Sequence, residues 1–323
     1  MRRIITLLLR KNRHSSHCKG RDFPIQAMSE LFGLRGAPCQ VLFFGDSVAE
    51  RVAREDKDTR TLDRMTADFL KGHLTLRGIT NSAYHSGVFY MLLQTLQLFV
   101  YKPSIAILPI NMRSFSPQWD LNPEFQCSDD IKNIKNYITK HGGRLKAPLY
   151  DTDRRTPLYK FLNTAVEFPD TSFRHIRQFI NIINSKPKNE KERTFRLKQI
   201  FTYHYLYPLT MSNRKLRLLK AALNYCQALN IKVAAYITPV NYRSGVKYAG
   251  RYFAQICNSN VKMIFRAFET KPNTIILRDY STLFTPDFFF NEDNSTEHLN
   301  QRGRLMLSKE IADMCLTLNK RMS

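Results

Sequence analysis

A serine and a histidine with the chemistry of an acyl-transfer site stand far apart in this sequence. Gly45-Asp46-Ser47 follows a short apolar run and precedes Val48-Ala49-Glu50, which opens a predicted helix. A serine in a strand-to-helix turn lies beside the backbone N–H groups that begin the helix, and such donors stabilise a developing oxyanion. Ordinary turns capped by serine or aspartate contain the same tripeptide. The tripeptide alone leaves a nucleophile and a capped turn both open.

A matching base stands near the C-terminus. Glu297-His298-Leu299-Asn300 directly precedes the predicted closing helix. An imidazole that reaches a serine hydroxyl takes its proton as general base and returns it to the leaving group. A lone loop histidine is otherwise a common surface residue. His298 therefore gains a catalytic meaning only if the fold brings it to Ser47.

Two further positions offer donors or space for a substrate. Asn111 follows a predicted strand, and its side-chain amide can donate to an oxyanion. The run from Asn81 to Gly87 follows another predicted strand, and Gly87 lets backbone approach a substrate closely. We expect Asn111 and Gly87 to lie near Ser47.

Strands and helices alternate around these residues. Short apolar runs predict five strands, at Gln40–Phe44, Leu76–Asn81, Ser104–Ile110, Ile231–Thr238 and Asn273–Asp279. Helices are predicted at Val48 to about Leu74, Val88–Leu98, Asn213–Leu229, Tyr248–Phe268 and Gly303 to about Leu318. Such alternation implies parallel strands joined by right-handed crossovers. We predict a three-layer α/β fold with a flavodoxin-like, mainly parallel sheet, whose site lies at the carboxyl ends of the strands.

A long polar stretch interrupts this alternation. Residues 117–212 contain predicted helices at Asp129–His141 and Ser172–Ile183 and a charged run from Lys186 to Arg193. We predict that 117–212 form a helical insertion, while 37–116 and 213–323 build one α/β domain. A separate domain at 117–212 is the alternative.

Residues 1–36 are predicted to form a basic tail. The apolar run Ile4–Leu9 is flanked by arginine and lysine, and it is shorter than the roughly 7–15 apolar residues of a secretory signal. A weak signal, a transit-like segment and a membrane-surface anchor remain alternatives. No stretch approaches the roughly 20 apolar residues that span a bilayer. These features predict a cytoplasmic or membrane-associated protein.

The charge balance is strongly basic. The chain has 50 Lys and Arg against 27 Asp and Glu, a formal net charge of +23 and a pI near 9.9. Such a field attracts anions, which include anionic lipid, acidic glycan and nucleic acid. The sequence has neither zinc-finger spacing nor an RNP-type aromatic motif, which argues against nucleic acid as a partner.

Neither a disulfide framework nor a metal site is predicted. The six cysteines are scattered without a CxxC pair, which favours reduced thiols. His14, His17 and Cys18 lack a fourth ligand at suitable spacing, so we expect neither a metal nor another cofactor.

Four short blocks, taken together, resemble the SGNH (GDSL-type) hydrolase superfamily. Gly45-Asp46-Ser47 resembles the nucleophile block, and His298-Leu299-Asn300 with Gly303 resembles the histidine block. Gly87 and Asn111 resemble the family's oxyanion donors, and Thr238-Pro239-Val240-Asn241 resembles a turn of some branches. The resemblance covers about Gln40–Asn111 and Lys232–Leu316, and it does not extend to the insertion.

Two positions depart from the family pattern. Ser295 stands where the family commonly has an aspartate, three residues before the histidine. Glu297 or Asp293 would then orient the imidazole, or a Ser–His dyad would act with support from a carbonyl group. The asparagine block lacks the usual Gly-x-Asn-Asp around Asn111. Branches with such departures include proteins tied to cell-surface glycan acylation.

The resemblance implies a serine-dependent acyl-ester hydrolase or O-acyl transferase. The expected substrate is an O-acylated glycan or another ester, with the insertion shaping the acceptor side. The alternative is a catalytically inactive SGNH-like protein that binds an anionic polymer or a membrane surface through its charge.

Overall fold

The computed structural model describes residues 23–34, 36, 38–116, 119, 126–146, 186–269 and 274–321. The apolar run Ile4–Leu9, the group of His14, His17 and Cys18, and the predicted helix Ser172–Ile183 lie outside the described residues.

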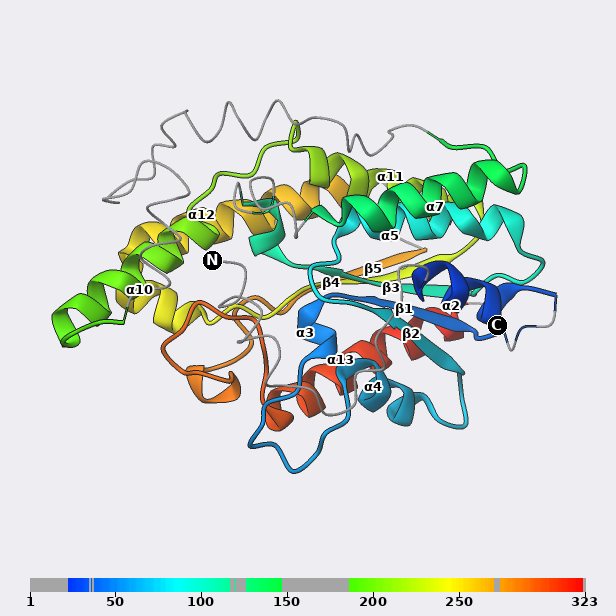
Figure 1. Cartoon of the computed structure of the whole chain (residues 1–323). Helices are drawn as coiled ribbons and strands as arrows, with labels where there is room; N and C mark the ends of the chain where they lie inside the picture. Colours follow the sequence, from blue (N-terminus) through cyan, green and yellow to red (C-terminus); the bar gives the residue numbers. More distant parts are fainter. Residues whose placement is uncertain are drawn as a thin grey trace.

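Five parallel strands form one sheet, which confirms the predicted fold class. They are β1 (Val41–Gly45), β2 (Leu76–Thr80), β3 (Ile105–Ile110), β4 (Lys232–Ile237) and β5 (Ile275–Asp279), in the flavodoxin-like order β2-β1-β3-β4-β5 (Figure 1). Gly45 is in register with Thr80, and Ile237 is in register with both Ile110 and Asp279. The carboxyl ends of the strands therefore meet along one edge.

Side chains of the central strands alternate between the two faces of the sheet, as the pleat requires. Leu42 and Phe44 of β1 belong to one hydrophobic core, and Val41 and Phe43 belong to the other. β3 and β4 alternate in the same way. Both faces are buried, which is why these strands read as continuous apolar runs in the sequence.

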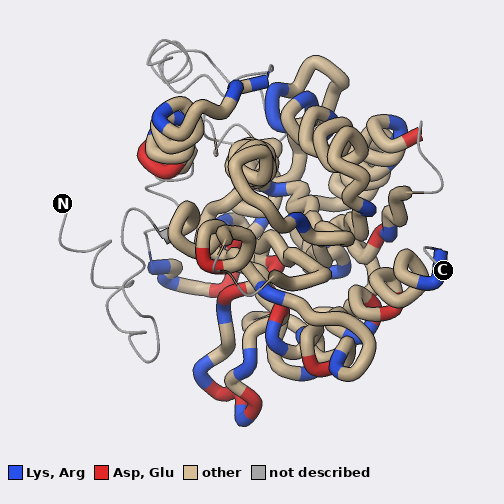
Figure 2. The backbone as a smooth tube through the Cα atoms, turned by 90° about the vertical axis from the view of Figure 1, so that its right-hand side faces the viewer, with Lys and Arg blue, Asp and Glu red and all other residues tan. Residues whose placement is uncertain are grey.

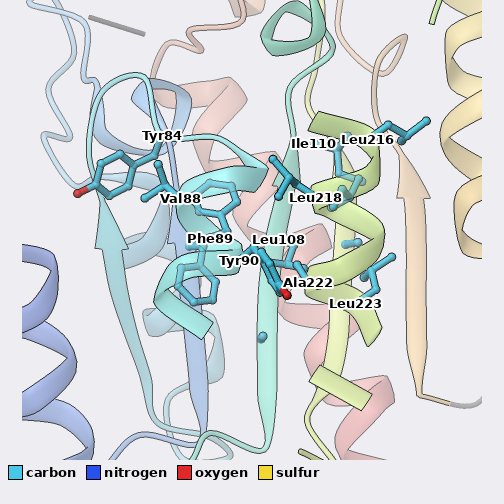
Figure 3. Packing of buried hydrophobic residues seen from close by; sticks show 14 of the residues in the cluster. Tyr84, Val88, Phe89, Tyr90, Leu108, Ile110, Leu216, Leu218, Ala222 and Leu223 are labelled. Carbon is cyan, nitrogen blue, oxygen red and sulfur yellow. The ribbon is translucent and has the colours of Figure 1, made fainter. Parts of the chain in front are cut away.

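Helices cover both faces of the sheet and give three layers (Figure 1). Residues of α2 (Phe23–Phe32), α5 (Ser86–Thr95), α7 (Ser128–Lys140), α10 (Glu190–Tyr205), α11 (Arg214–Ala228) and α12 (Tyr242–Phe268) belong to the first core. Residues of α4 (Leu62–Leu70) and α13 (Gln301–Lys320) belong to the second. Figure 3 shows side chains of α5 and α11 meeting above β3. Short elements complete the order: α3 (Ser47–Glu50), η1 (Leu96–Leu98), η2 (Met112–Phe115) and η4 (Pro286–Phe288).

The structure corrects the helix predicted from Val48 to about Leu74. The helix that begins at Ser47 lasts one turn, and a loop of residues 51–61 separates it from α4. Buried Arg304 of α13 binds this loop, donating to the Asp56 carboxylate and to the backbone oxygens of Asp58 and Arg60. These contacts with a distant helix hold the segment in a non-helical path, and sequence periodicity does not report them.

The structure also differs from the predictions at two helices. Residues 23–32, expected within the basic tail, form α2, with Met28 and Phe32 fully buried. The helix predicted at about Tyr248–Phe268 begins earlier, at Tyr242, and α12 is divided by a kink at Gly250, where the backbone is non-helical with a φ of 73°. In the segment predicted as an insertion, α7 packs on α5 and α10 packs on α12.

Charged residues, cysteines and helix lengths complete the description. Lys and Arg occur on many segments of the tube, with Asp and Glu between them (Figure 2). The five described cysteines are free. Within the described ranges, every helix is too short or too polar to cross a bilayer.

Candidate active site

The turn after β1 presents Ser47 at the carboxyl edge of the sheet. Asp46 caps α3, and its Oδ1 accepts from the Val48 N–H at 2.8 Å. Ser47 occupies the first helical position, where its N–H has no acceptor within the helix. Gly45 lets this turn pack tightly, because a Cβ there would lie 2.6 Å from side-chain carbons of both Ala49 and Thr80. Because α3 is a single turn, only the dipole of one turn acts on Ser47.

The fold brings His298 to Ser47. The Nε2 atom of His298 lies 3.1 Å from the Ser47 Oγ, between residues 251 positions apart in the chain. Ser47 is 7% exposed and His298 is partly exposed. This distance is within hydrogen-bond reach of a nucleophile and its base.

The Thr296 hydroxyl contacts the second ring nitrogen of His298, Nδ1. Its Oγ1 lies 3.2 Å from Nδ1 and accepts from the His298 backbone N–H at 3.1 Å. A hydrogen on Nδ1 would donate to this hydroxyl and leave Nε2 as the acceptor for Ser47. That tautomer is the one a general base requires.

Neither predicted acid contacts His298 in the part of the chain that the structure describes. The fully buried Glu297 accepts from the Tyr205 hydroxyl, and its Oε2 lies 3.0 Å from Nη2 of Arg113. Asp293 instead accepts from the Tyr248 hydroxyl at 2.6 Å and pairs with Arg193 and Lys247. The expectation that one of these carboxylates orients the imidazole does not fit these contacts.

Ser295, at the position where the family pattern has its acid, points to α10. Its Oγ lies 2.7 Å from Nδ1 of the buried His204. Asp293, Ser295 and Glu297 thus all contact α10, while Thr296 contacts His298 and His298 contacts Ser47. Residues 291–300, here named the histidine loop, are therefore held by a helix of the predicted insertion.

The turn after β4 supports the histidine loop from another direction. The buried Asn241 donates from Nδ2 to the backbone oxygens of Glu292 and Asn294, at 2.8 and 3.0 Å. The Phe290 N–H donates to the His298 oxygen at 3.0 Å. The backbone around His298 is thereby fixed on both sides.

Of the two predicted oxyanion donors, Asn111 lies beside the nucleophile turn. Its Nδ2 donates to Asp46 Oδ2 at 2.9 Å, and both residues line a cavity of about 10 Å³. An amide nitrogen carries two hydrogens, and among the described residues the second has no acceptor. Gly87 does not fit the expected role, because its single N–H donates to His85 Nδ1 at 3.1 Å.

Burial and charge lower the basicity of His298. Its pKa lies well below the usual value, first because burial disfavours the charged ring and then because the Arg113 and Arg51 charges oppose protonation. Burial raises the pKa of Glu297 and of Asp46, against the opposing effect of their hydrogen-bond and charge partners. The His298 imidazole is therefore neutral near neutral pH.

No family model matches the chain, and no curated protein matches it. Among solved structures, it is similar to a protein from Bacteroides fragilis NCTC 9343 described as a "putative acylhydrolase". That match has 14% identity and a TM-score of 0.39, and it covers 94% of this chain and 100% of the other. Similarity this low assigns neither a family nor a reaction.

The arrangement itself suits acyl transfer through serine. It has a hydroxyl, a neutral imidazole within hydrogen-bond reach, the Ser47 N–H at the start of α3, and the Asn111 amide, which contacts Asp46 in the same turn. In the described ranges, no three His, Cys, Asp or Glu side chains are placed to hold a metal ion.

Sequence reasoning missed the residues that support the site. No local sequence motif indicates the contacts of these residues with the histidine loop; they are Thr296, Arg113, His204 and Tyr205. One sequence signal is available at the end of the histidine loop, where Ser295 and Glu297 alternate with Thr296 and His298.

Proposed function

We propose that this protein is a serine-dependent acyl-ester hydrolase or O-acyl transferase of the SGNH (GDSL) type. The contact of 3.1 Å between Ser47 Oγ and His298 Nε2 carries the proposal. It joins two residues selected from the sequence for this chemistry, at the edge of the sheet where doubly wound folds place their sites.

The reaction proceeds through an acyl-enzyme. Ser47 Oγ attacks the ester carbonyl carbon while His298 Nε2 takes the hydroxyl proton. The Ser47 N–H and the Asn111 amide stabilise the oxyanion, and the imidazolium then gives its proton to the departing alcohol. In the second half, water or an acceptor hydroxyl attacks the acyl group, His298 takes its proton, and that proton returns to Ser47.

We take an O-acylated glycan as the substrate. A sugar hydroxyl as acceptor makes the protein a transferase, and water makes it a hydrolase. Support comes from the sequence resemblance, because branches without the usual acid and asparagine blocks include proteins tied to glycan acylation.

Labelling with a fluorophosphonate probe tests the proposal. We expect the wild type to be labelled at Ser47, as read by mass spectrometry of the modified peptide. Ser47→Ala and His298→Ala should lose at least about 90% of the labelling rate, because each removes a member of the nucleophile–base pair. Ser82→Ala is the matched control, since this exposed serine only donates to Glu50. Undiminished labelling of folded Ser47→Ala would contradict the proposal.

A specific observation favours a second candidate, a catalytically inactive protein that binds an anionic polymer or membrane surface. No described carboxylate contacts His298, and the net charge of the chain is +23. An absence of labelling in folded wild-type protein would select this candidate. Binding to an anionic polymer should then weaken steeply with salt and be unchanged in Ser47→Ala.

A further inference from the structure

The charges around the Ser47–His298 pair are unbalanced. Among the described residues no carboxylate contacts the imidazole, whereas the guanidinium groups of Arg113 and Arg51 both oppose its protonation. Arg113 has a carboxylate of its own, at 3.0 Å on Glu297. Arg51 is therefore the cation whose role is left unexplained.

Arg51 lies one helical turn after Ser47 and caps the C-terminal end of α3. Its backbone N–H donates to the Ser47 oxygen at 3.0 Å and closes the turn of α3. Residues four positions apart on such a turn share one face. Arg51 is exposed, so the side of the turn that carries the nucleophile also presents a cation to solvent.

The side chain of Arg51 forms neither an ion pair nor a hydrogen bond within the described ranges. The carboxylates whose charges reach it belong to Glu50 and Asp46. Glu50 accepts from Ser82, and Asp46 accepts from the Val48 N–H and the Asn111 amide. Arg51 is thus available to an anion from outside the chain.

The chemistry itself calls for a negative charge here. When His298 takes the Ser47 proton, an imidazolium forms whose charge is opposed by the Arg113 and Arg51 guanidinium groups. In a serine triad a carboxylate opposes that charge, but Thr296 supplies only a neutral hydroxyl. A negative charge on the substrate would pair with Arg51 and offset the imidazolium in the same step.

We infer that the site takes an acyl ester that carries an anionic group, a carboxylate or a phosphate, and that Arg51 binds this group. The inference rests on the proposed function and narrows its substrate to acidic esters. A neutral glycan ester would leave Arg51 without a partner, whereas an acidic one would use it.

Acylation rates of matched esters test the inference. One pair places the anion on the acyl side, the para-nitrophenyl monoester of adipic acid against para-nitrophenyl heptanoate. The other places it on the alcohol side, meta-carboxyphenyl butyrate against phenyl butyrate. The burst of released phenol reports acylation of Ser47 whether the acyl group then passes to water or to a hydroxyl. The readout is the anionic-to-neutral ratio within one variant, so differences in the amount of active enzyme cancel.

We expect the wild type to prefer the anionic member of at least one pair by about tenfold, the low end for one charge-assisted hydrogen bond. Arg51→Gln should bring that ratio close to one, and Arg51→Lys should keep most of it. Arg54→Gln is the matched control, an exposed arginine in the same loop, and should keep the wild-type ratio.

The outcomes separate the two proposals. Fluorophosphonate labelling with equal rates for both members of each pair would overturn the inference and leave the proposed function standing. A preference that persists in Arg51→Gln would also overturn it. No labelling and no burst with any ester would overturn the proposed function, and the inference with it.

Discussion

At the scale of single residues, Ser47 contacts one ring nitrogen of His298, and the other ring nitrogen contacts a hydroxyl group, that of Thr296, rather than a carboxylate. Thr296 can fix the tautomer of His298, but it carries no charge to oppose an imidazolium. Burial and two guanidinium groups act in the same direction and lower the pKa of His298. The base is thus held neutral, at the cost of a weaker affinity for the proton it must accept.

The low pKa of His298 predicts a specific pH dependence. The acylation rate should rise with pH through the His298 pKa, below the usual 6.5, and be level by neutral pH, because only the neutral imidazole is a base. Arg51→Gln removes a positive neighbour, so the protonated ring becomes less unfavourable and the rise should move to higher pH. Rates of fluorophosphonate labelling from pH 4 to 8 measure both profiles. A shift to lower pH, or the same shift in Arg54→Gln, would contradict this assignment.

At the scale of elements, α10 and the histidine loop act as one unit. In the second half of the loop, alternate residues have different partners: Ser295 and Glu297 contact His204 and Tyr205, while His298 contacts Ser47. Glu297 links three elements, because Arg113 from the end of β3 also reaches it. We therefore expect a movement of α10 to displace His298.

Removing the hydroxyl of Tyr205 tests this coupling. Tyr205→Phe takes a donor from a fully buried carboxylate, which costs about 1–3 kcal/mol of stability. The maximal acylation rate should fall by about tenfold with little change in half-saturation, because the base loses its position while the binding groups remain. Tyr236→Phe is the control, since its buried hydroxyl has no hydrogen-bond partner among the described residues. Equal effects of the two variants on the rate would show that Tyr205 does not position His298.

The sequence predicts the strands well, because an apolar run is a local signal, whereas the approach of His298 to Ser47 depends on the fold. Buried apolar runs mark β1, β3 and β4, and Asn111 follows β3 directly, while Ser47 follows β1 after Asp46. The supporting contacts are not local. Tyr205 is 92 residues from Glu297, and nothing in the composition of α10 points to that distant loop. The loop after α3 could not be predicted for the same reason, because the residue that binds it, Arg304, is distant in the sequence.

At the scale of the whole molecule, α13 ties the histidine side of the site to the serine side. Arg304 is fully buried and donates to the Asp56 carboxylate at 2.6 Å, while Gln301 accepts from the backbone of Lys57 and Asp58. The loop that these residues hold leads back to Arg51 and α3. We therefore expect the relative position of Ser47 and His298 to depend on a buried ion pair between residues 248 positions apart.

Breaking the ion pair between Arg304 and Asp56 should lower the free energy of unfolding far more than breaking an ion pair on the surface. Arg304→Met leaves the Asp56 carboxylate, 6% exposed, without its partner, and we expect a loss of about 3–5 kcal/mol in the free energy of unfolding. Urea titration followed by circular dichroism measures it. Arg302→Met, on the same helix, breaks an exposed pair with Asp287 and should change stability little. Because Arg304 also fixes the loop behind Ser47, the labelling rate of its folded fraction should drop as well. If Arg304→Met were no more costly than Arg302→Met, this ion pair would not hold the two sides of the site together.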